Sequence, residues 1–265
     1  MAYTAGLRRP TGRAALARWG GGTAGDKVGS SDLPNEPMPS TRCPVAPSDT
    51  ASRSARFTQF IAAPDFPCVG AKSALHKDRL RFAAYESFGE PDDVADLCAR
   101  LQAFSEEFPT PGNLPVSFVA MFREPVRGEV AFETALWAHL QAMHDHDRQS
   151  HAWDAAVSRD PADHDFSMSI AGRAFFVVGL HPDASRLSRR APFPCLVFNF
   201  HDQFESMKAS GKYQSMQTAI RARDVALQGS VNPVLARFGE ASEARQYSGR
   251  AVDAAWRCPF HGRDA

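Results

Sequence analysis

The sequence predicts an α+β domain with a small, mainly antiparallel sheet packed by helices. Amphipathic segments with helical spacing and short apolar segments typical of buried strands both occur along the chain. The predicted strands and helices do not alternate regularly, no phosphate-binding glycines lie between them, and no internal repeat is visible. These observations disfavour a nucleotide-binding doubly wound fold and a repeat protein.

The first segment, residues 1–56, differs from the rest in composition. Glycine, proline, serine, threonine and alanine dominate it, and basic residues outnumber acidic ones. Such a segment buries too little apolar surface to offset its ordering entropy, so we expect a disordered leader followed by one domain over residues 57–265. Its first 25 residues resemble a transit peptide. A start site placed too far upstream, with Met38 as the true start, is the favoured alternative because no apolar signal core is present.

Residues 92–108 form the clearest predicted helix. Pro91 and the two aspartates after it suit a helix start, and Pro109 ends the helix. Apolar residues recur at steps of three and four, which gives one buried stripe: Val94, Leu97, Cys98, Leu101, Phe104 and Phe108. A second helix is predicted over about 129–147, and a helical region over 202–227 breaks near Ser210-Gly211.

Three short segments are apolar on both faces and are predicted to be buried strands: 115–122, 173–180 and 194–200. The link between the last two is too short for a crossover helix, so we expect them to pair antiparallel. His181 follows one of these strands and His201 follows the other. Antiparallel pairing would place the two histidines at opposite edges of the sheet.

Charge and cysteine content exclude several classes of function. Thirty Lys+Arg balance thirty Asp+Glu, so there is no overall electrostatic reason to bind nucleic acid or an anionic membrane. No apolar run approaches the ~18 residues of a transmembrane helix. The five cysteines are odd in number and form no CxxC motif, which favours neither a disulfide framework nor a structural zinc site. A reducing cytoplasm fits best.

His181 is the first candidate for chemistry, because an imidazole at the end of a rigid apolar strand suits an axial metal ligand or a general base. Arg186, Arg189 and Arg190 follow it and form a potential anion clamp. A carboxylate-bearing cofactor such as haem would use this clamp for its propionates, with His181 at the iron. The alternatives are a histidine that bonds a nearby carbonyl and a solvated basic loop.

Other residues remain open as ligands or catalytic groups. His201 and Glu205 are four apart and share one face of the helix expected there, with Asp202 beside them. Cys68 and Cys258 lie in turn-like segments of the kind that hold thiolate ligands, although a free cysteine is more often a small buried apolar residue. The histidines of segment 132–151 lack the spacing of known zinc sites, so zinc hydrolysis is disfavoured.

Several longer motifs resemble the YqcI/YcgG family. They lie in the family's order and span about 57–260: residues 66–72 (FPCVGAK), 175–182 (FFVVGLHP), 197–205 (VFNFHDQFE), 223–233 (RDVALQGSVNP) and 256–260 (WRCPF). Characterised members of this family include guanidine and arginine N-hydroxylases. The resemblance therefore implies an enzyme that binds haem b, activates O2 with electrons from an external donor, and hydroxylates a guanidino or amino nitrogen of a small, arginine-like molecule.

These roles are expectations for specific residues. His181 ranks first as the iron ligand and His201 second, with Cys68 and Cys258 behind them. Arg186 and Arg190 are expected to hold the propionates. Glu205 and Asp202 are expected to position the cationic nitrogen, and Phe176, Phe198 and Phe200 to line the haem slot. The rival interpretation is a non-catalytic haem-binding or haem-carrying protein. No nucleic acid or membrane partner is expected.

Overall fold

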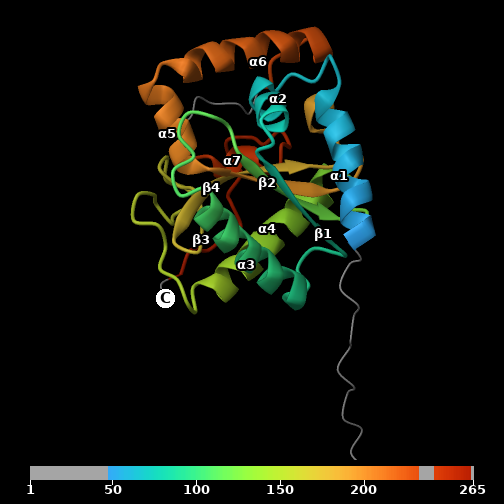
Figure 1. Ribbon diagram of the computed structural model, residues 1–265. Helices are drawn as coiled ribbons and strands as arrows, with labels where there is room; N and C mark the ends of the chain where they lie inside the picture. Colours follow the sequence, from blue (N-terminus) through green and yellow to red (C-terminus); the bar gives the residue numbers. More distant parts are fainter. Residues whose placement is uncertain (1–46, 233–241, 264–265) are drawn as a thin grey trace, which may run out of the picture. The chain divides into compact units, whose positions relative to one another are not determined.

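The computed structural model describes residues 47–232 and 242–263 (Figure 1). Most of the expected leader lies outside these ranges, so its disorder stays a prediction. The described chain begins with helix α1, so the folded part starts ahead of Phe57. The helices and strands follow in the order α1 (Pro47–Ala62), α2 (Val69–His76), β1 (Leu80–Tyr85), α3 (Pro91–Glu107), β2 (Ser117–Phe122), α4 (Glu129–Asp147), β3 (Met168–Ile170), β4 (Arg173–Leu180), a 3-10 turn (Leu187–Arg189), β5 (Cys195–Phe200), α5 (His201–Ala209), α6 (Lys212–Gln228) and α7 (Ala244–Tyr247).

The strands form one mixed sheet in the order β1-β2-β5-β4-β3. Only β1 and β2 pair in parallel, which is possible because α3 provides the crossover between them. The other neighbours pair antiparallel, so the predicted α+β class with a mainly antiparallel sheet is confirmed. The antiparallel pairing of β4 with β5 is confirmed as well, with Phe175 opposite Phe200 and Leu180 opposite Cys195.

The predicted helices over 92–108 and 129–147 correspond to α3 and α4, and the region 202–227 contains α5 and α6. Gly211 separates the last two helices with a φ of 72°, a conformation that other residues rarely adopt. Strands β1 and β3 and helices α1, α2 and α7 were not predicted. No helix in the described parts of the chain is long and apolar enough to cross a bilayer.

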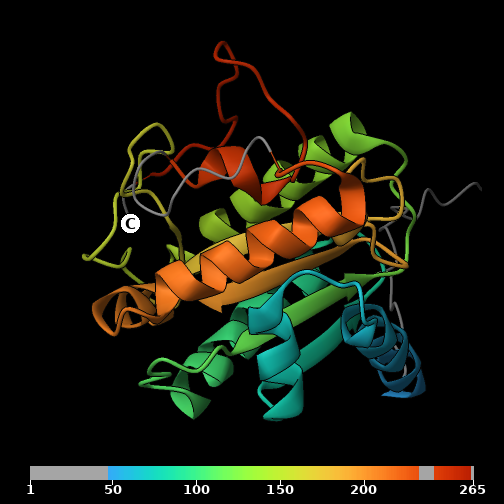
Figure 2. The same cartoon turned by 90° about the horizontal axis from the view of Figure 1, so that it is seen from above.

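Helices cover the two faces of the sheet in different ways. On one face, α3 and α4 close a continuous aromatic core around Phe118, Phe175, Phe198 and Phe200. On the other face, α1 and α2 pack over Val119, Met121 and Cys195, while α6 lies over the strands (Figures 1 and 2). Side chains alternate along each strand, so the central strands β2 and β5 supply apolar groups to both faces.

β4 approaches α4 and α7 closely at Gly179. A side chain carbon at this position would lie 2.7 Å from Leu136 and Phe132 and 2.8 Å from the Tyr247 carbonyl oxygen. β4 therefore packs against these two helices only because glycine has no side chain.

Substituting Gly179→Ala should reduce the free energy of unfolding by about 1–3 kcal/mol, because the added methyl overpacks a closed core. Urea denaturation measures this change. Gly70→Ala is the matched control, since its added carbon would meet its neighbours at ordinary contact distances of 3.5–3.7 Å. Equal stability of the two variants would contradict the packing described here.

Candidate functional site

A cavity of about 290 Å³ lies between the sheet and helices α2 and α6. This volume is near the lower end of small-molecule sites, which span roughly 300–1,000 Å³. Its walls are mostly apolar. The sheet contributes one side, and α2 and α6 contribute the other, through residues that include Val119, Phe176, Val178, Val197, Ala71, Met216 and Ile220.

A few polar groups interrupt this apolar lining. Gln203 and Gln246 are 2% and 4% exposed, and both line the cavity. The Gln203 carbonyl oxygen accepts the Val116 N–H, but its NH2 group and the Gln246 side-chain amide bond no other described residue. The buried Nε of Arg221 also has no partner within the described chain. The cavity thus contains polar side chains whose hydrogen-bonding capacity the protein does not use.

Cys68 places a thiol in the same cavity. It precedes α2, and its Sγ accepts a hydrogen bond from the backbone N–H of Ala71 at 3.4 Å. Burial raises the pKa of this thiol, whereas hydrogen bonds from the amides of Ala71 and Gly70 and the charge of Arg189 lower it. The backbone donors and the positive end of the helix are the features that favour a thiolate once a cation approaches.

A buried ion pair fastens α6 over the cavity. Arg186, in the loop after β4, donates to the carboxylate of Asp224 on α6 and to the carbonyl oxygen of Ser230. Both side chains of the pair are less than a tenth exposed. Gln228 adds a second connection by accepting the Leu187 N–H. Replacing one member of such a pair leaves an uncompensated buried charge.

Substituting Asp224→Ala should therefore reduce the free energy of unfolding by about 3–5 kcal/mol. Asp202→Ala is the control, because it breaks an ion pair with Arg173 in which Asp202 is 54% exposed, and exposed pairs contribute at most about 1 kcal/mol. Chemical denaturation distinguishes the two variants. Similar losses in both would show that the Arg186–Asp224 pair does not hold α6 in place.

The structure brings few of the predicted site residues to this cavity. Phe176 lines it, as expected for a slot residue. Phe198 and Phe200 do not, because their positions on β5 point them to the α3/α4 face, where they are fully buried in the aromatic core. The expectation that all three phenylalanines line one slot is therefore wrong, and the physical reason is the alternation of side chains along a strand.

The predicted arginine clamp is also not assembled. Arg186 is occupied by Asp224, and Arg190 is exposed and donates to the carbonyl oxygen of Ala184. Arg189 is buried and donates to the carbonyl oxygens of Gly179, Gln246 and Tyr247. The three side chains diverge because each meets a different backbone or side-chain partner. Of the three, only Arg189 lines the cavity.

His181 lies on the opposite face of the sheet from the cavity. Its ring stacks on Phe132 of α4 with centroids 4.3 Å apart, it is 1% exposed, and its Nδ1 has no partner among the described residues. Burial lowers its pKa. Because β4 and β5 are antiparallel, His181 and His201 lie at opposite ends of a ladder of five residue steps, about 17 Å long. The two histidines cannot share one ion, as the sequence predicted.

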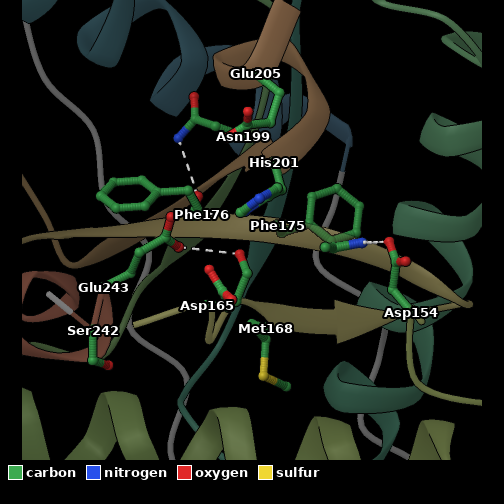
Figure 3. Close-up of polar contacts among 12 residues, drawn as sticks. Asp154, Asp165, Met168, Phe175, Phe176, Asn199, His201, Glu205, Ser242 and Glu243 are labelled. Atoms are coloured by element: carbon green, nitrogen blue, oxygen red, sulfur yellow. Dashed lines mark hydrogen bonds and ion pairs between the residues drawn. The ribbon is translucent and has the colours of Figure 1, made fainter. Parts of the chain in front are cut away.

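His201 instead lies beside a buried acid, Glu243 (Figure 3). Its Nδ1 is 3.7 Å from a Glu243 carboxylate oxygen. Ser167 and Tyr247 donate hydrogen bonds to the other oxygen of Glu243, which is 2% exposed. Burial raises the pKa of Glu243 to about 8, and burial lowers that of His201. Both groups are therefore held in their neutral forms near neutral pH.

The two carboxylates expected to bind substrate, Asp202 and Glu205, face the surface of α5. Each is 54% exposed, and they pair with Arg173 and Lys208. Neither lines the cavity. A cationic nitrogen in the cavity would not meet them.

Glu243 predicts a pH dependence of stability. The carboxyl group of the unfolded chain ionises near pH 4.5, and that of the folded chain near pH 8, so the folded chain holds more protons over this interval and loses stability as pH rises through it. Relative to Glu243→Gln, the wild-type chain should lose on the order of 1 kcal/mol per pH unit between pH 6 and 8. Thermal or urea unfolding at several pH values measures the difference, and parallel profiles would refute the assignment.

The remaining candidates lie elsewhere. Cys258 lines a second, more open cavity of about 990 Å³ that residues 159–164 also line, and burial raises its pKa to about 12. On helix α4, His144 accepts a hydrogen bond from the backbone N–H of Arg263, and His139 accepts one from the backbone N–H of Gly89. Within the described residues, the one close group of metal-binding side chains is Asp163, His164 and Asp165, and it is largely exposed.

Fold and cavity together define an α+β protein with an apolar cavity on one sheet face. The chain belongs to the YqcI/YcgG family, whose model matches residues 57–261. The match covers the sheet, α2 to α7 and the cavity, and it confirms the resemblance found in the motifs. Comparisons with curated proteins and with solved structures gave no significant match.

Proposed function

We propose that this protein is a haem-dependent N-oxygenase that hydroxylates a guanidino or amino nitrogen of a small molecule. Membership of the YqcI/YcgG family supports the proposal, because the family resemblance implies this chemistry. The observation that carries it in the structure is the apolar cavity, which combines a thiol, neutral amides and a guanidinium. Haem requires an apolar slot, a donor atom for iron and partners for its propionates.

The residues present supply part of these requirements. The sheet face and α6 form two apolar walls, Cys68 offers a donor atom, and Arg221 and Gln246 offer unused hydrogen-bond donors for acidic groups. A tetrapyrrole needs more room than this cavity of about 290 Å³ provides, so haem would enter only if unbranched side chains of the lining, such as those of Met207 and Met216, moved. Bound haem would supply O2 activation with electrons from an external donor.

The same lining determines which groups a cationic substrate would contact in the cavity. Asp224 is the one carboxylate among the described lining residues, and Arg186 already neutralises it. A guanidino group would therefore meet aromatic faces, such as those of Phe176 and Phe204, instead of a free carboxylate. This replaces the expected roles of Asp202 and Glu205.

A cytoplasmic location remains part of the proposal. The four described cysteines, Cys68, Cys98, Cys195 and Cys258, are all free thiols. Free thiols are typical of a reducing compartment, where glutathione and thioredoxin keep cysteines reduced.

The first test is haem loading followed by turnover. The purified protein, titrated with haem b, should develop a Soret band that saturates at one haem per chain. With O2, a chemical reductant and a panel of guanidines and amines, mass spectrometry should then detect a product that has gained one oxygen atom.

Controls without O2 and without haem should give no product. A colourless protein after haem titration would contradict the proposal outright. A saturating Soret band with no oxygenated product from the whole panel would instead support the rival function, a haem carrier without catalysis.

A further inference from the structure

We infer that the second cavity binds a small organic anion that carries phosphate or several carboxylate groups. This cavity of about 990 Å³ is lined by three segments that are far apart in the sequence: the loop 159–164, residues at the start of α7, and the C-terminal segment 256–262. The inference goes beyond the proposed function and does not depend on it, because no described residue lines both this cavity and the one between the sheet and α6.

Direct contacts between the three segments hold the walls of the second cavity together. Ser242 donates a hydrogen bond to the carbonyl oxygen of Pro161 at 2.6 Å, which joins the segment before α7 to the loop. A side-chain carbon at Gly262 would lie 2.5 Å from the carbonyl oxygen of Arg159, so the C-terminal segment approaches the loop this closely only because glycine has no side chain. These contacts form the cavity before a ligand binds, which lowers the entropic cost of binding.

The C-terminal wall contains one of the motifs that resemble the family, residues 256–260 (WRCPF). All of its residues except Pro259 line the second cavity, and none of them lines the cavity between the sheet and α6. Gln141 of α4 exchanges two hydrogen bonds with the backbone of His261, which fixes the chain directly after the motif. This motif therefore contributes to a site that the proposed haem cavity does not use.

Each of the three segments contributes one arginine to the lining: Arg159, Arg245 and Arg257. Arg245 donates to the carbonyl oxygen of Asp253, and its guanidinium lies 5.7 Å from the centre of the Trp256 ring. Arg257 donates to the carbonyl oxygens of Ala254 and Trp256. Neither Arg245 nor Arg257 pairs with a carboxylate in the described parts of the chain. Backbone carbonyls thus orient both guanidiniums, and their charge stays available for an anion.

The two carboxylates of the lining, Asp160 and Asp163, are bonded within their own loop. Asp160 accepts the backbone N–H of Ala162, and Asp163 accepts that of Asp165. His164 lies 3.0 Å from the Asp163 carboxylate. Because three arginines line the cavity with only two aspartates, the lining has a surplus of positive charge. This surplus favours an anion over a cation.

The size of the cavity narrows the class of ligand. A volume of about 990 Å³ lies at the upper end of the roughly 300–1,000 Å³ of small-molecule sites, so one inorganic ion would leave most of it unfilled. Guanidinium groups bind phosphate and carboxylate oxygens in bidentate geometry. The half-buried ring of Trp256 offers aromatic surface to the organic part of the ligand. An organic anion of about the size of a nucleotide matches these features.

Isothermal titration calorimetry of the purified protein with ADP, pyrophosphate and citrate tests this inference. At least one of the three should bind at one site per chain with a Kd below about 1 mM. Added NaCl should weaken this binding, because exposed charges supply the attraction. Tighter binding of citrate than of ADP would identify carboxylates as the preferred groups, and the reverse order would identify phosphates. Adenosine, which lacks phosphates, should not bind.

The double variant Arg245→Gln/Arg257→Gln should bind the tightest of these anions at least about tenfold more weakly, because it loses charge-assisted hydrogen bonds. The matched control is Arg100→Gln/Arg127→Gln, which removes two charges from side chains that are more than half exposed and lie outside the cavity. It should bind like wild type. Circular dichroism verifies the fold of both. If the first variant does not fold, Arg257→Gln alone, at an exposed position, should still weaken binding at least about threefold.

Three results would overturn the inference: no saturable binding of any of the three anions, equal weakening in both double variants, or adenosine binding as tightly as ADP. The last result would show that the arginines contribute nothing to recognition. Each of these results is distinct from a failure of the proposed function, which the Soret band and the oxygenated product measure separately.

Discussion

The buried ion pair between Arg186 and Asp224 is the interaction on which the candidate site depends. It joins the loop after β4 to α6, and α6 forms one wall of the cavity. Without this pair, α6 would be held over the strands by its contacts with α5 and α2 and by the hydrogen bond between Gln228 and Leu187. Arg186 neutralises the charge of Asp224. Among its described lining residues, the cavity therefore contains positive and neutral polar groups but no free carboxylate. The same interaction thus determines both the shape and the charge of the site.

The sheet separates structural and functional roles. Side chains alternate along β2, β4 and β5, so each strand contributes to a closed aromatic core on the α3/α4 face and to the cavity on the other face. Gly179 illustrates the first role, since it allows β4 to pack tightly on α4. Val178, its neighbour, lines the cavity. A haem site on the cavity face leaves the aromatic core undisturbed, which is why we place the ligand there.

Much of the fold could be predicted from the sequence because its signals are local. The apolar period of α3 and the two-faced apolar runs of β2, β4 and β5 each depend on neighbouring residues.

The site could not be predicted in the same way. Phe176 and Phe198 look equivalent in sequence, yet their register on antiparallel strands sends them to opposite faces. Arg186 was expected to bind an anion from outside, but its partner, Asp224, comes from a helix whose position no local pattern reveals. Cys68, in a turn-like segment, lines the cavity, whereas the two histidines ranked above it as iron ligands do not.

A crystal structure of the protein loaded with haem b would test the central claim most directly. The account predicts haem density between the sheet and α6. Haem beside His181 on the α3/α4 face, or a cavity that stays empty under saturating haem, would contradict it.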